Sequence, residues 1–328
     1  MSSKRKHFLW LLATLGLIAA AILLWNPARS LFSFRKVDEH PLYTMHLYNN
    51  DSFARYIEDS EQAAQTTALP QAGPVWACTV FNAADLDGAR LLGRNFDWNH
   101  SPALLLFNHP REGYDSVSMV DISYLGFDLG NPTIVDRFQA FDAAHIPFDG
   151  MNEAGLAVGM NAISHAEAML EPGNPTVDTL VPIRLILDQA ATVDEALAIL
   201  QNYNIDFEGQ TPIHYLIADT SGNSIIIEYI NNEMRILEQE NPGWQVSTNF
   251  LLSERPAETW PQACNRYRHA AETLTQHDGQ LDTASAMSLL EDTSQGSTRW
   301  SVVYHMESGE IDLVMGRDYG EVLHFELR

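Results

Sequence analysis

Residues 78–98 read CTVFNAADLDGARLLGRNFDW, two apolar runs separated by the turn-forming residues Asp85-Leu86-Asp87-Gly88. Apolar runs on both sides of such a turn predict a β-hairpin, which would bring Arg94 and Asp97 back beside Cys78. A thiol flanked by a guanidinium and a carboxylate is a place where nucleophilic chemistry is feasible. A lone cysteine on a strand is more often a small buried apolar residue, so the rest of the chain has to separate the two interpretations.

The composition excludes several classes of protein. The chain has 328 residues, of which 45% are hydrophobic and 19% are charged, as is typical of a globular protein. Its formal net charge of −24 argues against a nucleic-acid partner, which needs basic patches that neutralise phosphate. It also argues against binding of the folded part to an anionic membrane surface. Every lysine lies at or before Lys36, which separates an N-terminal segment from the remaining body.

The cysteine and glycine patterns predict no metal and no cofactor. Cys78 and Cys264 are the two cysteines; they form neither a C-x-x-C pair nor a zinc-binding pattern, and H-E-x-x-H is absent. The glycines between residues 148 and 161 do not form G-x-G-x-x-G, so no dinucleotide site is predicted. In an oxidising compartment the two cysteines are able to pair, and a paired Cys78 would not be a nucleophile. Otherwise Cys264 is interpreted as a buried structural thiol.

The N-terminus has the features of an export segment. Lys4-Arg5-Lys6 precede an uncharged apolar run from Phe8 to Trp25. This run is longer than a typical signal-peptide core and slightly shorter than a typical membrane span. We interpret residues 1–30 as an N-terminal hydrophobic helix that acts as a signal anchor, with a cleaved signal peptide or a buried helix as the alternatives. The helix would bind the membrane, and the body, anchored or secreted, would lie outside the cytoplasm.

Residues 31–77 form a mixed stretch between this helix and the body. Residues 46–61 are predicted to form a short helix, and the small and polar residues from Gln62 to Pro74 are typical of a linker. The stretch is either a spacer between the membrane and the body or a propeptide that ends at Ala77.

From residue 75 onward, strand and helix patterns dominate. Besides the first hairpin, strands are predicted at residues 104–107, 117–122, 156–161, 213–218, 224–230, 234–237, 244–248, 300–305, 311–315 and 322–327. Helices are predicted at residues 180–190, 192–200, 261–275 and 283–291. Residues 148–155 are predicted as a turn, and the small residues of 156–161 permit close approach of another backbone. This order predicts an α+β body, a four-layer αββα sandwich of two antiparallel sheets.

Several short motifs occur in a fixed order along the chain. They are Cys78-Thr79, Gly93-Arg94-Asn95-Phe96-Asp97, Met151-Asn152-Glu153-Ala154-Gly155-Leu156, Gly159-Met160-Asn161, Ser247-Thr248-Asn249 and Asn265-Arg266-Tyr267. Each alone is weak, but the ordered set resembles the choloylglycine hydrolase and penicillin V acylase family, with its related acyltransferases and acid ceramidase-type amidases. The resemblance covers residues 78–328. It implies an N-terminal nucleophile (Ntn) hydrolase fold and an enzyme that hydrolyses carbon–nitrogen bonds of small N-acyl substrates, in linear amides other than peptides.

The resemblance also implies a set of catalytic residues: Cys78, Arg94, Asp97, Asn161, Asn249 and Arg266. Cys78 would be the nucleophile, Arg94 would favour its thiolate, and Asp97 would accept a hydrogen bond from its α-amine. The backbone of Asn161 and the side chain of Asn249 would donate hydrogen bonds to the oxyanion.

Arg266 would support the same network, with Arg268 as the alternative if the register is shifted by two. Taken singly, such residues also have structural interpretations. An Arg–Asp pair is often a surface ion pair, and an asparagine is often a turn residue. His145 and His214 lie in loop or apolar stretches and are interpreted as packing residues.

Elementary chemistry explains why the cysteine would have to be N-terminal. A thiol titrates near ~8.5 and an α-amine near ~7.7–8.0, so an α-amine on the same residue is able to take the thiol proton. A peptide nitrogen cannot do this. We therefore expect residues up to Ala77 to be removed by attack of Cys78 on the Ala77 carbonyl, after which Cys78 forms thioesters with its substrates.

Two other functions stay open at this point. An acyltransferase would pass the acyl group to an amine instead of water. An unprocessed, non-catalytic surface binding module would keep the fold with Cys78 masked by residues 31–77. A papain-like protease is less favoured because it needs a positioned histidine, and no histidine here has a recognisable context. A structural envelope protein is less favoured because the polar residues around Cys78 would be costly to bury without a function. Residues 104–107 and 124–127 fit an acyl pocket or the core equally well, so neither the acyl and amine specificity nor the oligomeric state is predicted.

Overall fold

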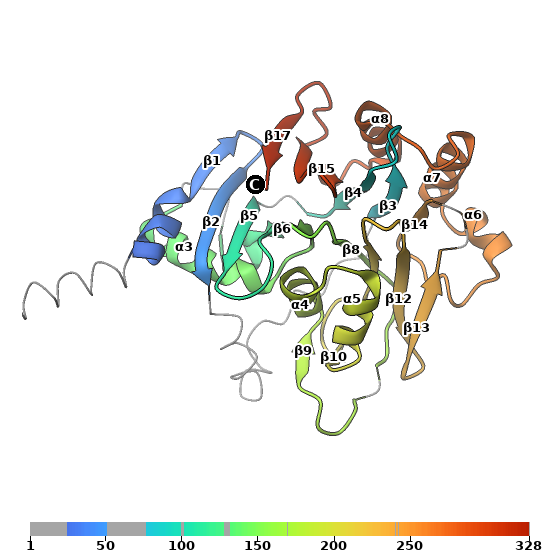
Figure 1. The fold of residues 1–328 in the computed structure, drawn as a ribbon, viewed down its shortest axis with the longest axis horizontal. Coiled ribbons are helices and arrows are strands. Elements are labelled where there is room, and N and C mark those ends of the chain that lie inside the picture. Colours follow the sequence, from blue (N-terminus) through green and yellow to red (C-terminus); the bar gives the residue numbers. More distant parts are fainter. Residues whose placement is uncertain are drawn as a thin grey trace, which may run out of the picture.

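The computed structural model describes residues 25–50, 77–99, 102–127, 132–168, 170–239, 241 and 243–327. The described chain is built on two β-sheets, one of nine strands and one of six, with helices packed on them (Figure 1). A separate parallel pair is formed by β9 (Thr176–Asp178) and β10 (Asn204–Asp206). The structure is therefore of the expected α+β class.

The nine-stranded sheet has the order β1-β2-β5-β6-β7-β8-β11-β12-β13. Its strands are β1 (Arg35–Asp38), β2 (Leu42–Asn50), β5 (Ala103–Pro110), β6 (Ser116–Asp121), β7 (Asp149–Asn152), β8 (Ala157–Ala162), β11 (Ile213–Ala218), β12 (Ser224–Ile230) and β13 (Glu233–Glu238). Neighbours are antiparallel except β2 and β5, which are parallel. The prediction of two antiparallel sheets is therefore wrong for this sheet. More than fifty residues separate β2 from β5, and a connection of this length permits the two strands to run parallel, whereas a tight hairpin would make them antiparallel.

The six-stranded sheet has the order β14-β3-β4-β15-β16-β17 and is antiparallel throughout. Its strands are β14 (Gln245–Ser247), β3 (Thr79–Ala84), β4 (Arg90–Asp97), β15 (Thr298–His305), β16 (Glu310–Met315) and β17 (Leu323–Glu326). The predicted hairpin is confirmed as β3 and β4. Both strands are buried along their whole length, which places them in the interior of the molecule.

Two pairs of helices pack on the two sheets. α4 (Val181–Gln189) contacts β7 and β8, and α5 (Val193–Leu200) contacts β11. α7 (Asn265–Gln276) contacts β3 and β14, and α8 (Thr283–Thr293) contacts β4 and β15. The shorter helices are α3 (Ile134–Gln139), α6 (Trp260–Ala263), η1 (Ile122–Leu125), η2 (Ala140–His145) and η3 (Ala257–Thr259). The single helix predicted at residues 261–275 is thus divided into α6 and α7, with Cys264 in extended conformation at the break.

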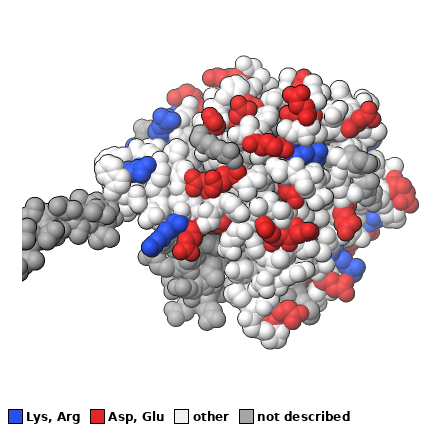
Figure 2. All heavy atoms as spheres, in the orientation of Figure 1, with Lys and Arg blue, Asp and Glu red and all other residues white. Residues whose placement is uncertain are grey.

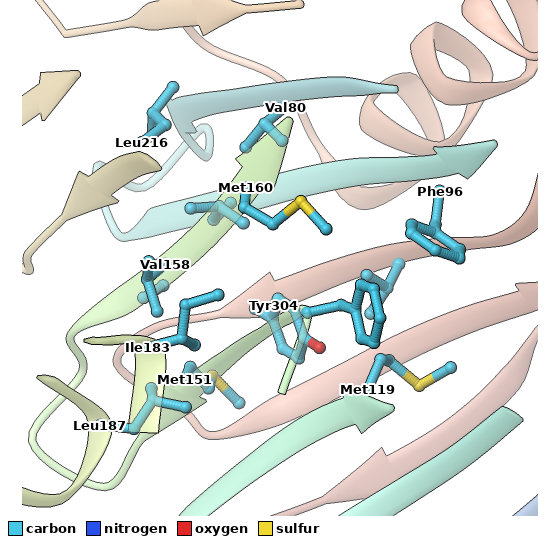
Figure 3. Close-up of a cluster of buried hydrophobic side chains, with 14 of the residues drawn as sticks. Val80, Phe96, Met119, Met151, Val158, Met160, Ile183, Leu187, Leu216 and Tyr304 are labelled. Atoms are coloured by element: carbon cyan, nitrogen blue, oxygen red, sulfur yellow. The ribbon is translucent and has the colours of Figure 1, made fainter. Parts of the chain in front are cut away.

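Apolar side chains from both sheets and from α4 meet in one core (Figure 3). The two sheets are close together at β8, where a Cβ atom added to Gly159 would lie 3.0 Å from the side chain of Val80 on β3. A side chain at Gly159 would require the Val80 side chain to shift, so the predicted close approach at residues 156–161 is confirmed. Removal of these apolar surfaces from water is the main source of stability.

The segment before Cys78 contributes to the nine-stranded sheet. Along β2, Met45 and Leu47 are buried while His46 and Tyr48 are half-buried, which is the alternation of a strand. The helix predicted at residues 46–61 is therefore wrong for residues 46–50, because their pairing with β5 decides the conformation. The remainder of that helix and the predicted linker, residues 51–74, lie outside the described residues. The division into residues 1–30, 31–77 and 78–328 stays a prediction.

Acidic side chains outnumber basic ones on one face of the molecule (Figure 2). On the face shown in Figure 2, acidic side chains are widespread and basic ones are few. The predicted hydrophobic helix falls mainly on residues 1–24, outside the described residues. Within the described part, no helix is long and apolar enough to cross a membrane. The anchor and the location outside the cytoplasm stay predictions.

Candidate active site

The β3–β4 hairpin places the predicted nucleophile beside its predicted partners. Thr79 is paired with Asn95, so Cys78, which directly precedes β3, lies next to the end of β4, where Asp97 is located. Cys78, Arg94 and Asp97 are all buried. The interpretation of Arg94 and Asp97 as a surface ion pair therefore does not apply.

Gly93 on β4 leaves room for the aromatic ring of Phe81 on β3. Phe81 is paired with Gly93, and a Cβ atom added at Gly93 would lie 2.3 Å from the Phe81 ring. Glycine leaves room for the ring, which accounts in packing terms for the glycine that precedes Arg94. The ring in turn fixes the part of β4 that carries the guanidinium.

The thiol of Cys78 is free and buried. Burial raises its pKa, and the positive charges of Arg94 and Arg266 and a hydrogen bond from the backbone of Asp97 oppose the rise. The thiol of the uncleaved chain is thus protonated at neutral pH and needs a base before it can attack a carbonyl. Cys264 is also a free thiol, so the two cysteines do not form a disulfide in this structure.

Asp97 offers a buried acceptor beside Cys78. Its Oδ1 accepts a hydrogen bond from the hydroxyl of Thr298, whereas its Oδ2 has no partner among the described residues. Burial raises the pKa of Asp97 to about 6, although the Thr298 hydroxyl, Arg266 and Arg94 favour the carboxylate. A carboxyl group with this pKa is able to accept a proton near neutral pH. The free Oδ2 is also where a cationic donor such as an α-ammonium would be held.

Arg94 is held by a carboxylate that the motifs did not identify. Its Nη1 donates to Oδ2 of Asp149 at 2.7 Å and to the carbonyl of Phe148, and both charged side chains are fully buried. Tyr304 and Trp300 donate to the same carboxylate at 2.5 and 3.2 Å. Nε and Nη2 of Arg94 have no partner among the described residues, so the guanidinium keeps donors for a thiolate or a substrate.

Asp149 was missed because its stretch is rich in turn-forming residues. Residues 148–155 were expected to form a turn, but residues 149–152 form strand β7 and only the residues after them turn. The pairing of β7 with β6 and β8 supplies the hydrogen bonds that make such a short segment a strand. Burial raises the pKa of Asp149, and the Arg94 charge opposes that rise. An isolated aspartate before a glycine gives no sequence signal of this role.

The two predicted oxyanion donors come from different sheets. Asn161 lies on β8, where its Oδ1 accepts from Ser247 Oγ at 2.6 Å and its Nδ2 has no partner among the described residues. Asn249 follows β14, and its Nδ2 donates to the carbonyl of Ala162 at 2.7 Å. An amide nitrogen carries two hydrogens, so one hydrogen of Asn249 stays available. The side chain of Asn161 is an available donor in addition to its predicted backbone donor.

Arg266, in the first turn of α7, joins these groups. It donates to the carbonyl oxygen of Cys78, to Thr79 Oγ1 at 3.3 Å and to Asn249 Oδ1 at 3.1 Å. Arg268 is half-exposed and lies 4.0 Å from Glu272. The structure thus brings Arg266, rather than Arg268, into contact with the predicted site. The catalytic roles of the six residues stay predictions.

Known proteins identify the family of this chain. The family described as "linear amide C–N hydrolases, choloylglycine hydrolase family" matches residues 78–262, more than half of the chain. The chain belongs to this family. The match begins at Cys78 itself, and the resemblance found from the motifs is confirmed.

Two curated relatives support this membership. Penicillin V acylase of Pectobacterium atrosepticum is 30% identical over 188 residues, which are 53% of this chain and 49% of that protein. The bile salt hydrolase/transferase of Clostridium perfringens is 26% identical over 173 residues, or 49% of this chain and 50% of that protein. The chain spans about half the length of the curated relatives it matches.

Solved structures of the family share the fold. A mutant of the conjugated bile acid hydrolase of Clostridium perfringens superposes with a TM-score of 0.57 at 18% identity, covering 76% of this chain and 92% of that one. Penicillin V acylase from Agrobacterium tumefaciens gives a TM-score of 0.54 at 19% identity, covering 76% and 86%. An Ntn-hydrolase-like α+β fold, with one mixed and one antiparallel main sheet, is therefore established for this family member. Within the described ranges, no group of three or more His, Cys, Asp or Glu residues is arranged to hold a metal ion.

Proposed function

We propose that this member of the choloylglycine hydrolase family is an N-terminal cysteine amidase that hydrolyses a linear amide of an N-acyl substrate through a thioester on Cys78. The observation that carries the proposal is the buried Oδ2 of Asp97, which has no partner among the described residues and lies beside a buried thiol. A buried acceptor without a donor is costly. An α-ammonium on Cys78 would satisfy it, and the family match that begins at residue 78 supports the same assignment.

The first step of this proposal is cleavage of the chain. The carboxylate of Asp97 takes the thiol proton, and Sγ of Cys78 attacks the Ala77 carbonyl. The peptide bond breaks as its nitrogen takes up the proton, which leaves Ala77 as a thioester and frees the α-amine of Cys78. Water then hydrolyses the thioester, so that Ala77 ends in a carboxylate. The pKa of Asp97, about 6, suits a base at neutral pH.

The second step is turnover. The α-amine of Cys78 takes the thiol proton, and the thiolate, favoured by Arg94, attacks the substrate amide. Asn161 and Asn249 donate hydrogen bonds to the oxyanion of the tetrahedral intermediate, and Arg266 holds Asn249. The substrate nitrogen leaves with the proton, and water releases the acid from Cys78.

Acyl transfer is the second candidate, because the Clostridium relative carries both activities in its name. An amine would then intercept the thioester in place of water. The two reactions share every residue named above, so they differ in the acceptor alone.

The direct test uses penicillin V and a conjugated bile acid as probes, with the purified full-length chain and its Cys78→Ala variant. We expect release of a primary amine by the wild-type chain and none by the variant, together with a hydroxylamine-sensitive acyl adduct on Cys78. Glycine amide added as an acceptor reports on acyl transfer as a new amide product. Equal amine release by the wild-type chain and Cys78→Ala would refute the proposal.

A further inference from the structure

A row of polar side chains crosses the inner face of the nine-stranded sheet. Asn161 on β8 is paired with His214 on β11, and His214 Nδ1 lies 2.9 Å from Oε1 of Glu228 on β12. All three side chains are fully buried in a region that is otherwise mainly apolar. Neighbouring residues of an antiparallel pair point to the same face, so Asn161 and His214 both face the six-stranded sheet. Buried ionisable groups are costly unless they are paired, which raises the question of what this pair holds.

Glu228 binds the segment that carries Asn249. The backbone nitrogens of Leu252 and Ser253 donate to its two carboxylate oxygens at 2.9 and 3.0 Å, and Ser253 Oγ donates at 2.6 Å. Leu252 and Ser253 lie three and four residues after Asn249, in the loop that follows β14. Burial raises the pKa of Glu228, but the hydrogen bonds from His214 and Ser253 outweigh burial, so the pKa lies below its usual value. The carboxylate is therefore ionised at neutral pH.

His214 extends this contact toward Asn161. With a hydrogen on Nδ1 it donates to Glu228 and leaves Nε2 as an acceptor, which has no partner among the described residues. Asn161 Nδ2 is likewise a donor without a partner there. The side chains of His214 and Asn161 are not hydrogen-bonded to each other, so what joins these two residues is the backbone pairing of β8 with β11. Through this pairing, the strand of Asn161 is connected to Glu228 and to the segment of Asn249.

We propose that Glu228 and His214 are positioning residues that fix the two oxyanion donors, Asn161 and Asn249, relative to each other. This role rests on the proposed function. Asn161 lies on β8, whereas Asn249 lies in the loop after β14. Ser247 Oγ and Asn249 Nδ2 bind the start of this loop to β8, and Glu228 binds it a few residues further on. Preorganised donors must lie within hydrogen-bond distance of the oxyanion, and displacement by about 1 Å costs roughly 10²-fold in rate. A carboxylate that binds two successive backbone nitrogens supplies that constraint.

The test compares Glu228→Gln with Glu238→Gln, the same substitution at an exposed position of the neighbouring strand β13. A glutamine at 228 keeps the shape but turns one acceptor into a donor that faces another donor. We expect kcat to fall about 10–100-fold with KM changed less than about 3-fold, because oxyanion contacts form in the transition state. Cleavage before Cys78 should still occur. Hydrogen exchange of the amides of residues 252 and 253 should become faster, while Glu238→Gln leaves all readouts unchanged.

A pair of variants at His214 covers the case in which Glu228→Gln does not fold. His214→Asn keeps a donor near the position of Nδ1, whereas His214→Leu removes it at a similar size. We expect His214→Asn to retain most of the kcat and His214→Leu to resemble Glu228→Gln. A residue with a merely structural role would lower the melting temperature in both variants without this difference in kcat.

The outcomes separate the inference from the proposed function. Unchanged exchange at residues 252 and 253 in Glu228→Gln, or faster exchange with an unchanged kcat, overturns the positioning role. A wild-type chain that neither starts at Cys78 nor releases amine overturns the proposed function, and the positioning role falls with it. In that case the exchange data still show whether Glu228 holds the loop.

Discussion

Replacement of Asp149 by asparagine should destabilise the protein strongly while changing few atoms. The substitution keeps the shape of the side chain but removes the counter-charge of Arg94, which lies 2.7 Å away with both side chains fully buried. It also places an –NH₂ group where the carboxylate accepted hydrogen bonds from Tyr304 and Trp300. The variant therefore leaves a buried cation without its partner and at least one buried donor without an acceptor.

The magnitude follows from the burial of this pair. Breaking a buried ion pair by removing one partner costs about 3–5 kcal/mol, because the remaining charge is uncompensated in a medium of low polarity. Exposed pairs contribute about 0–1 kcal/mol. The matched control is Glu233→Gln, which removes a carboxylate 2.6 Å from Arg235 at a half-exposed surface site. Against a total stability of roughly 5–15 kcal/mol, the loss at Asp149 should be a large fraction.

Urea unfolding, followed by tryptophan fluorescence, measures this difference. Both substitutions are made in the Cys78→Ala chain, so that no sample contains a mixture of cleaved and uncleaved molecules. The fully buried Trp300 lies against Asp149 and reports on the same region. We expect a loss of about 3–5 kcal/mol for Asp149→Asn and below about 1 kcal/mol for Glu233→Gln. A loss below 1 kcal/mol at Asp149 would refute the ion-pair reasoning.

Three further predictions concern the same framework. After self-cleavage, the fragment that carries β2 should copurify with the body, because β2 pairs with β5 along its length; Met45→Asp should release it, and free fragment in the unsubstituted protein would contradict this. The pKa of Asp97 is about 6 in the folded chain and ~3.9 in the unfolded chain. Between these two pH values the folded chain binds more protons than the unfolded chain, so the free energy of unfolding falls as the pH rises from the lower value to the higher one. Urea midpoints of Cys78→Ala with and without Asp97→Asn test this, and equal pH profiles would count against it. Arg266→Ala should lower kcat/KM about 10–100-fold, since a hydrogen bond from a charged donor is worth roughly 1.5–3 kcal/mol. Arg268→Ala should change kcat/KM by less than about 2-fold. Equal losses in the two variants would contradict the assignment of the network to Arg266.

Local patterns explain what could be predicted from the sequence. The β3–β4 hairpin follows from one turn and two apolar runs, so no distant residue is needed to specify it. The second helix of the middle region, α5, begins as its T-x-x-E pattern predicts, with Thr192 Oγ1 accepting from the backbone of Glu195 at 3.2 Å. The glutamate side chain departs from the usual box, because it binds the nitrogen of Ala191 at 2.7 Å.

Contacts between distant segments explain what could not be predicted. β2 is defined by a parallel pairing with β5, and its sequence also fits a helix until that partner is known. Asp149 and Glu228 acquire their roles from Arg94 and from the loop after Asn249, which lie far away in the chain. A single buried carboxylate leaves no periodic pattern. Arg266 could be predicted only from the family motifs. Its contacts with Cys78 and Thr79 are far away in the chain, and no local pattern indicates them.

The central claim, that Cys78 becomes an N-terminal nucleophile by self-cleavage, is tested most directly by the N-terminal sequence and intact mass of the purified protein. We predict a chain that begins at Cys78, together with a separate N-terminal fragment that ends at Ala77, and neither in Cys78→Ala. Because no lysine follows Lys36, a chain starting at Cys78 should take up a single amine label. A fully folded wild-type protein in which the Ala77–Cys78 peptide bond is intact would contradict the account.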